Sequence, residues 1–267
     1  ISPGTPSLTW FDANFRKEAW IHYTDVWIAE EHAVAFISGI AKNWWKPILA
    51  IWSPFIQRTY DQLSHDLALN SNPATILVTF NGINGWDATH LWIFDIPLIS
   101  NIPNMVYFAP TTKEEYLAML DWSVEQNKHP VAIRMPAWVM ISSWIEDKTD
   151  YSILNKFEMT NLWNEIAIVW VWSYYHLAKQ VKEVLDKELN INTTLINPKF
   201  VTWLDTQMLE KLKETHKIVI TLEDGCLDGW FWEKITRYFG TSTMKVLNYW
   251  AKKEFTDRIP LTKLLEE

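Results

Sequence analysis

The sequence predicts an α/β protein made of two consecutive three-layer domains, each a sheet covered by helices. Short apolar strands alternate with amphipathic helices along most of the chain, which is the pattern of parallel sheets with crossover helices. A polar stretch without periodicity interrupts this alternation near residue 150. With 48% hydrophobic and 21% charged residues among 267, the composition excludes a disordered chain and supplies apolar side chains for two cores.

The first series of elements precedes residue 142. Strands are predicted at Lys46–Trp52, Thr75–Phe80, Met105–Ala109 and Val131–Met135, and helices at Pro54–Leu69 and Thr112–Gln126. Ser53 is the expected N-cap of the first helix, because Pro54 suits the first helical position. Thr112 and Glu115 have the spacing of a capping box at the start of the second helix.

The second series follows a polar stretch, Ser142–Asn164, which is predicted to connect the two domains. Downstream, strands are predicted at Ile166–Trp170, Thr193–Ile196, Ile218–Leu222 and Met244–Leu247, and helices at His176–Leu189, Thr206–His216 and Phe231–Tyr238. The expected domains therefore span residues 1–145 and 164–267, with a linker at residues 146–163.

Charge and cysteine content exclude several classes of function. The net charge of −8 argues against a nucleic-acid-binding surface. We expect no membrane segment, because the chain has no apolar stretch of 18 residues, and its first residues do not have the pattern of a signal peptide. The single cysteine, Cys226, excludes an internal disulfide framework and a cysteine zinc site, and it fits a cytoplasmic location. Cys226 follows a predicted strand, where a small buried residue is more common than a nucleophile.

The segment Asp25–Val34 places Glu30 and Glu31 at the start of an apolar-periodic helix. The two carboxylates could complement the positive end of the helix dipole. Alternatively, a glutamate between apolar flanks could exchange a proton with a ligand nitrogen. Taken alone, the segment favours the dipole interpretation.

The segment Ala50–Asp61 places Trp52, Phe55 and Arg58 at a strand end and on the helix that follows. Ligands of open α/β sheets bind beyond the carboxyl ends of the strands, and aromatic rings there could stack on a planar heterocycle. Packing of the helix against the sheet explains the same residues equally well.

A third segment, Asn81–Asp95, is a polar loop after a strand and contains Asp87 and His90. Polar loops at strand ends are disproportionately functional.

Together these segments resemble the C-terminal portion of the 1-deoxy-D-xylulose-5-phosphate synthase family, thiamine-diphosphate enzymes of the transketolase superfamily. The matching strings are IAEEHAVAF, KPILAIWSPFIQRTYDQLSHDLAL, DATH…FDIPLISNIPNMVYFAP, HPVAIRMP and TLEDGCLDGWF. The resemblance covers nearly the whole chain and implies a pyrimidine-binding domain followed by a transketolase C-terminal-like domain. It also implies that the second domain supports dimerisation rather than chemistry.

The resemblance implies roles for four residues on the cofactor side. Glu30 matches the catalytic glutamate that hydrogen-bonds N1′ of the aminopyrimidine of thiamine diphosphate and promotes proton loss from the thiazolium. Trp52 and Phe55 match the aromatic wall against the pyrimidine, and Arg58 matches an arginine in the same segment. In such enzymes the cofactor supplies the reactivity, and the protein orients it and manages protons.

On the substrate side, Asp87 and His90 match a polar loop that faces the reacting carbons, with His90 in a catalytic role. Arg134 matches an arginine that contacts the substrate phosphate, a task that suits a guanidinium group. The implied reaction passes a two-carbon unit from a 2-oxo acid or ketose to an aldehyde, so phosphorylated sugars and 2-oxo acids are the implied substrates.

The chain departs from the family pattern at three places. Thr79 and Phe80 stand where the family has an Asp-Arg pair, and the loop Gly85–His90 is one residue shorter than in the family. The string RMPAW at Arg134–Trp138 replaces RYPRG. These changes remove basic residues that would bind phosphate.

The superfamily holds Mg²⁺ and the diphosphate in a separate domain with a GDG…N motif, which this chain lacks, and we expect no metal ligands here. The first strand and helix of the pyrimidine-binding domain are also expected to be missing. We therefore expect a fragment of a longer enzyme or one subunit of a split transketolase. It would need a diphosphate-binding domain or subunit and would assemble as a homodimer or heterotetramer. The alternatives are a 2-oxo-acid dehydrogenase β-type subunit and a non-catalytic homologue that acts as an interaction subunit.

Tryptophan is unusually frequent, with 18 residues against 7 glycines, where ordinary usage would give about 19 glycines. Compared with the family pattern, tryptophan stands at glycine positions at Trp27, Trp92, Trp138, Trp172, Trp230 and Trp232. Glycine tolerates positive φ at turns, and an added indole strains a packed interior. We therefore expect strain at these positions, and we hypothesise that many of these tryptophans are not the native residues.

Overall fold

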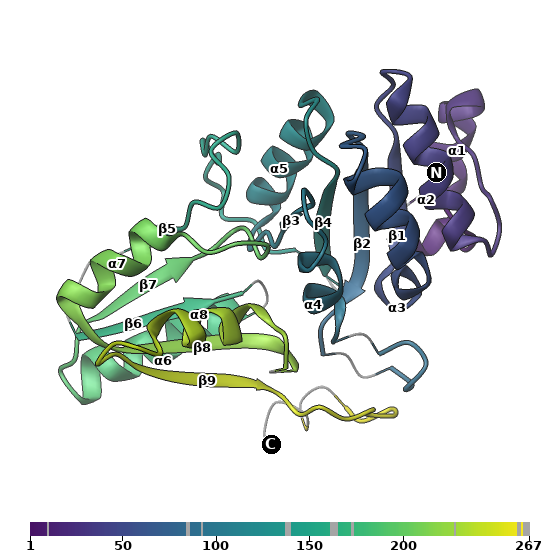
Figure 1. Ribbon diagram of the computed structural model, residues 1–267. Helices are drawn as coiled ribbons and strands as arrows, with labels where there is room; N and C mark the ends of the chain where they lie inside the picture. Colours follow the sequence, from purple (N-terminus) through teal and green to yellow (C-terminus); the bar gives the residue numbers. More distant parts are fainter. Residues whose placement is uncertain are drawn as a thin grey trace.

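The chain folds into two α/β units, seen in a computed structural model that describes residues 1–9, 11–83, 86–91, 93–136, 140–160, 165–171, 174–226, 228–260 and 263. The expectations for Gly85, Trp92, Trp138 and Trp172 lie outside these residues. The two sheets lie beside each other, each with helices packed against it (Figure 1). The predicted fold class is confirmed.

The first sheet contains four parallel strands in the order β1–β2–β4–β3. They are β1 (Ile48–Trp52), β2 (Thr75–Asn81), β3 (Val106–Phe108) and β4 (Val131–Pro136). All four lie where the sequence predicts strands, with ends that shift by one or two residues, as strand ends commonly do between assignments. Trp52 pairs with Thr79, so the carboxyl ends of β1 and β2 lie side by side.

Helices cover both faces of this sheet, because alternate strand residues point to opposite sides. The helical segments are η1 (Pro6–Thr9), α1 (Ala13–Ala19), η2 (Trp20–His22), α2 (Glu30–Lys42), α3 (Ser53–Ile56), η3 (Gln57–Thr59), η4 (Gln62–Ala68), α4 (Asp95–Ser100) and α5 (Lys113–Glu125). Leu49 and Ile51 share a core cluster with residues of α2 and η4. Ala50 belongs to a second cluster with residues of α5. This division produces the predicted three layers.

Helix starts differ in detail from the prediction. Ser53 is the first residue of α3 rather than its N-cap, and its Oγ donates a hydrogen bond to the Phe80 carbonyl oxygen at 2.9 Å. This bond ties the start of the helix to the end of β2. At α5, Thr112 caps the helix as predicted, but Glu115 accepts from the Thr111 N–H at 2.6 Å rather than from Thr112.

The second sheet has five strands in the order β5–β7–β6–β8–β9. Its elements are β5 (Glu158–Thr160), β6 (Glu165–Trp170), α6 (Tyr175–Glu188), β7 (Thr193–Asn197), α7 (Thr206–Thr215), β8 (His216–Cys226), α8 (Phe231–Phe239) and β9 (Lys245–Ala251). The pairs of β6, β7, β8 and β9 are parallel, as predicted, whereas β5 runs antiparallel to β7. β5 lies inside the stretch expected to be a linker, so the second unit begins earlier than predicted.

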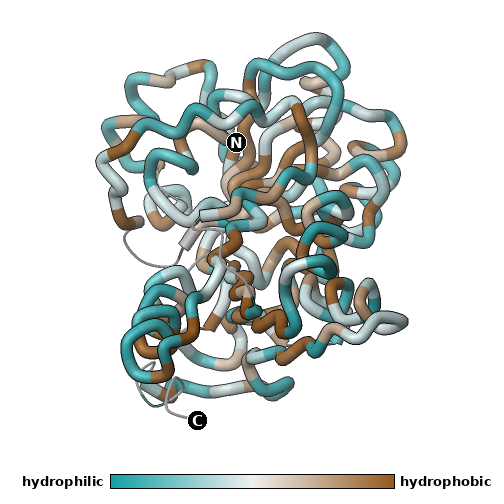
Figure 2. The backbone as a smooth tube through the Cα atoms, turned by 90° about the vertical axis from the view of Figure 1, so that its left-hand side faces the viewer, coloured by the Kyte–Doolittle hydropathy of each residue, from teal (hydrophilic) through white to brown (hydrophobic). Residues whose placement is uncertain are grey.

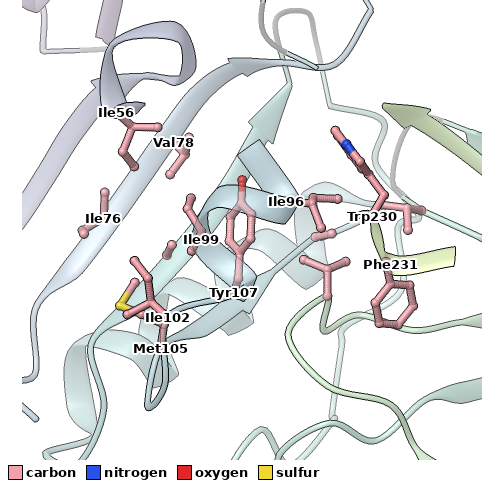
Figure 3. Packing of buried hydrophobic residues seen from close by; sticks show 14 of the residues in the cluster. Ile56, Ile76, Val78, Ile96, Ile99, Ile102, Met105, Tyr107, Trp230 and Phe231 are labelled. Carbon is pink, nitrogen blue, oxygen red and sulfur yellow. The ribbon is translucent and has the colours of Figure 1, made fainter. Parts of the chain in front are cut away.

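Buried contacts join the two units. One core cluster contains Ile96 and Tyr107 from the first unit together with Trp230 and Phe231 from the second (Figure 3). The N–H of Val201 donates to the Tyr107 carbonyl oxygen at 2.9 Å. Hydrophobic stretches of the backbone run through the interior of both halves, and hydrophilic stretches occupy outer loops and helices (Figure 2). The relative placement of the units is therefore set by packed side chains.

Among the tryptophans that the structure describes, four adopt a backbone conformation that favours glycine. Trp20, Trp27, Trp44 and Trp144 have φ angles of 44°, 60°, 68° and 57°, and their side chains are largely exposed. A bulky L-residue at positive φ is strained, because its Cβ crowds the backbone. The expected strain is confirmed at Trp27.

The buried tryptophans at family glycine positions, Trp230 and Trp232, behave differently. Trp230 and Trp232 are enclosed in the core, and Trp230 has an ordinary φ of −82°. Gly225 provides space for one of them, because a Cβ at that position would lie 1.9 Å from the Trp230 ring. The interior therefore accommodates the Trp230 indole, and the strain expected there is not found. Trp232 is enclosed with an Nε1 that has no hydrogen-bond partner among the described residues.

Candidate functional site

Glu30 occupies the first turn of α2, where its neighbours along the helix face the core. Ala33, Val34 and Ile37 are fully buried, and this apolar stripe fixes which way the helix is turned. As a result Glu30 is only 2% exposed, whereas the adjacent Glu31 lies in solvent. The sequence alone favoured a pair of equivalent dipole-stabilising carboxylates, but the structure separates the two.

The buried carboxylate of Glu30 has an oxygen that is not satisfied by the described part of the chain. Its Oε2 accepts no hydrogen bond there, and its ion-pair partner is Arg58, whose Nη1 lies 3.5 Å away. Buried polar atoms usually have a partner. The arrangement therefore provides a carboxylate ready to engage a hydrogen-bond donor or proton from a ligand.

An aromatic cluster lies at the carboxyl ends of β1 and β2. We define it as Trp52, Phe55, Phe80, Trp86 and His90. The Trp52 ring centroid lies 4.5 Å from that of Phe80, 5.5 Å from that of Trp86 and 5.6 Å from that of His90. The rings of Trp52 and Phe55 are near parallel at 6.1 Å. The short helical run after β1 links the two parts, since it carries Phe55 in the cluster and Arg58 beside Glu30.

The polar loop after β2 orients His90. Asp87 Oδ1 accepts hydrogen bonds from the Thr89 N–H at 3.0 Å, from the Thr89 hydroxyl and from His90 Nδ1 at 3.0 Å. Hydrogen bonds from Thr89 and then from His90 hold the pKa of the Asp87 carboxyl well below its usual value. A carboxylate can only accept, so Nδ1 carries the hydrogen and Nε2 is left for another group.

Arg134 lies apart from these residues, in a fully buried ion-pair cluster. Its Nε and Nη2 donate to Asp95 at 2.8 and 3.2 Å, and its Nη1 donates to Asp224 at 2.6 Å. Tyr107 donates its hydroxyl hydrogen to the same Asp95. Burial opposes the charge of Arg134, but Asp224 and Asp95 outweigh it and hold its pKa well above the ordinary value. This guanidinium group bridges the two units, and the structure offers no support for its predicted contact with a phosphate.

Two members of the aromatic cluster, Phe80 and Trp86, are not predicted as site residues from the sequence. In the sequence, Phe80 stands out only as a departure from the family pattern, and Trp86 only as part of a polar loop. The signal for Phe80 was its position at the end of a strand beside Trp52. Its φ of 62° is unusual for a bulky residue and turns the chain into the polar loop.

The structure also bears on Cys226, on possible metal ligands and on membrane-spanning helices. Cys226 is buried, its Sγ accepts a hydrogen bond from Trp230 Nε1 at 3.1 Å, and burial raises the pKa of its thiol. It therefore lacks the thiolate character of a nucleophile. Within the described ranges, no group of three or more His, Cys, Asp or Glu side chains could hold a metal ion. None of the helices found there is long and apolar enough to cross a membrane.

Each of the two units matches a known protein family. Residues 5–137 match the transketolase pyrimidine binding domain, and residues 156–252 match the transketolase C-terminal domain. The chain is 36% identical over 234 residues to a 1-deoxy-D-xylulose-5-phosphate synthase of Clostridium tetani, covering 86% of the chain and 37% of that protein. It is 38% identical over 218 residues to the synthase of Francisella tularensis subsp. novicida, covering 81% and 34%. The chain thus spans about a third of the length of these curated relatives.

The fold also matches a solved structure of a split gene transketolase, described as an inactive beta4 tetramer. The TM-score is 0.82 at 18% identity, and the match covers 98% of this chain and 84% of that chain. At this identity the likeness concerns the fold alone. The two domain matches, in the same order along one chain, show that the protein belongs to the transketolase family, with a pyrimidine-binding domain followed by a C-terminal domain.

Proposed function

We propose that this chain is the pyrimidine-binding part of a thiamine-diphosphate-dependent ketol transferase, similar to 1-deoxy-D-xylulose-5-phosphate synthase, and that Glu30 engages N1′ of the cofactor. One observation carries the proposal: the Glu30 carboxylate is buried, and its Oε2 accepts no hydrogen bond from the described residues. A protonated pyrimidine nitrogen or its imino form would supply the missing partner. The family match supports this cofactor class.

The remaining site residues fit the same ligand. Trp52 and Phe55 present aromatic rings of the kind on which a pyrimidine stacks. The Nη1 of Arg58 lies 3.5 Å from Glu30 Oε2 and places a positive charge beside this carboxylate. Bound thiamine diphosphate would supply a carbon nucleophile. On the substrate side, His90 is held by Asp87 with Nε2 free to hold a proton beside the reacting carbons. The donor would be a 2-oxo acid or a ketose, and the two-carbon unit would pass to an aldehyde.

We further propose that the diphosphate and Mg²⁺ are held by another domain or subunit. The curated relatives are about three times as long as the matched stretch, and the split gene transketolase of similar fold is described as an inactive beta4 tetramer. A homodimer or heterotetramer that includes the diphosphate-binding part is therefore the proposed active form. Calorimetry of the isolated chain with thiamine diphosphate and Mg²⁺ is expected to show weak binding. Tight binding would contradict the proposal that another domain or subunit holds the diphosphate and Mg²⁺.

The test of Glu30 is a Glu30→Ala variant in the reconstituted assembly with the diphosphate-binding part. Loss of a positioned proton donor or acceptor is expected to lower kcat by about 10²–10⁴-fold. Glu31→Ala is the matched control, because it removes the adjacent exposed carboxylate from the same helix turn. Equal activity of Glu30→Ala and the wild type would assign Glu30 a structural role. An inactive wild-type assembly would favour the non-catalytic interaction subunit.

A further inference from the structure

The chain continues beyond β9 as a tail that reaches back to the first unit. We define the C-terminal tail as residues 252–260. In Figure 1 it leaves the second unit and runs toward the loop that follows β2. At its base Lys253 forms an ion pair with Asp228 of the second unit. Further along, the Phe255 ring lies edge-on to Phe94 of the first unit, with centroids 6.2 Å apart. The tail therefore contacts both units.

Two hydrogen bonds connect the C-terminal tail to the site loop, defined as residues 86–90. The N–H of Arg258 donates to the Trp86 carbonyl oxygen at 2.9 Å. The N–H of Ala88 donates to Asp257 Oδ1 at 3.2 Å. These bonds engage the backbone on either side of Asp87, the residue that orients His90. The tail thus holds the backbone of the site loop beside Asp87, which in turn orients His90.

The site loop contains no helix or strand, so contacts with other elements set its place against the sheet. The rings of Trp86 and His90 contact Trp52, and the two hydrogen bonds from the tail add contacts to the loop backbone. Irregular loops with few backbone partners open at low free energy. The ring centroid of Trp86 lies 5.5 Å from that of Trp52, and displacements near 1 Å can cost a catalytic site about 10²-fold.

We propose that Asp257 is a positioning residue, whose carboxylate, together with the Arg258 amide, holds the site loop so that Trp86 and His90 keep their places in the aromatic cluster. The C-terminal domain thereby contributes to the substrate side of a site built on the other domain. The catalytic consequence rests on the proposed function, whereas the anchoring of the loop is a property of the chain itself.

Hydrogen exchange of the chain, followed by mass spectrometry, tests the anchoring. Asp257→Ala is expected to speed exchange in residues 86–90 about fivefold, the ratio that corresponds to the loss of one ordinary hydrogen bond. Asp257→Asn keeps an acceptor oxygen and is expected to retain most of the protection. Glu254→Ala removes a carboxylate from the same tail without touching the site loop, and it is expected to exchange like the wild type.

A chain that ends after Lys252 provides a second variant, because it removes both tail hydrogen bonds at once. Unchanged exchange of residues 86–90 in both Asp257→Ala and the shortened chain would overturn the proposal. In the reconstituted assembly, Asp257→Ala is expected to lower kcat severalfold at an unchanged urea midpoint, with recovery in Asp257→Asn. An assembly that is inactive even with the wild-type chain would sink the proposed function, and the exchange result would still decide the role of the tail.

Discussion

Replacement of Trp144 by glycine is expected to stabilise the protein. Trp144 has a φ of 57° and a side chain that is 91% exposed, so the substitution removes almost no buried apolar surface. A left-handed backbone costs an L-residue about 1–2 kcal/mol, and the greater unfolded-state freedom of glycine costs about 0.4–1 kcal/mol. The difference is a gain of about 0–1.6 kcal/mol, centred near 0.8 kcal/mol, in the free energy of unfolding.

Urea unfolding followed by far-UV circular dichroism measures this gain without relying on indole fluorescence. Trp203→Gly is the matched control, because Trp203 is also well exposed but is not among the residues with positive φ, and its replacement is expected to destabilise the fold. Trp27→Gly should give a smaller gain, since more of the Trp27 side chain is covered. If Trp144→Gly destabilised the chain as much as Trp203→Gly, the strain argument would be refuted.

Three further predictions concern buried groups. Arg134→Ala leaves Asp95 and Asp224 buried without their cation and is expected to lower the free energy of unfolding by about 3–5 kcal/mol in urea titrations. Burial raises the pKa of the Glu223 carboxyl well above its ordinary 4.5, so the folded chain retains a proton that the unfolded chain releases, and stability falls as pH rises above that value. Glu223→Gln should therefore be more stable than the wild type at pH 8 but not at pH 5 when urea midpoints are compared. Cys226 should resist iodoacetamide until the chain unfolds, and rapid alkylation of the native protein would contradict its burial.

The sheets could be predicted from the sequence because their strands are continuous apolar runs. Ile48–Trp52 and Val131–Pro136 carry this signal within a few residues, and parallel strands buried on both faces require it. β5 carried no such signal: Glu158–Thr160 is short and partly exposed, and only its pairing with β7 makes it a strand. Local pattern cannot reveal an element whose stability comes from a distant partner.

The candidate site likewise combines contacts that the local sequence predicts with contacts that depend on distant residues. Trp52, Phe55 and Phe80 meet because neighbouring parallel strands end at the same edge, which topology dictates once the strands are known. Asp224 and Arg134 lie 90 positions apart, and Asp257 lies 169 positions from Ala88. No spacing rule anticipates these contacts, and the family resemblance, which implies a phosphate contact for Arg134 and no site residue in the C-terminal domain, does not indicate them either.

These distant contacts change what the second domain does. Arg134 pairs in register with Val78 of β2, two residues before Phe80, and Asp224 of the second unit holds its Nη1. The end of β2 is therefore connected to the second unit through Arg134 of β4, while the C-terminal tail holds the loop that follows β2. Loss of either contact would affect Trp86 and His90, because these two members of the aromatic cluster follow the end of β2 in a loop without helix or strand. The second domain thus belongs to the framework of the site as well as to the fold.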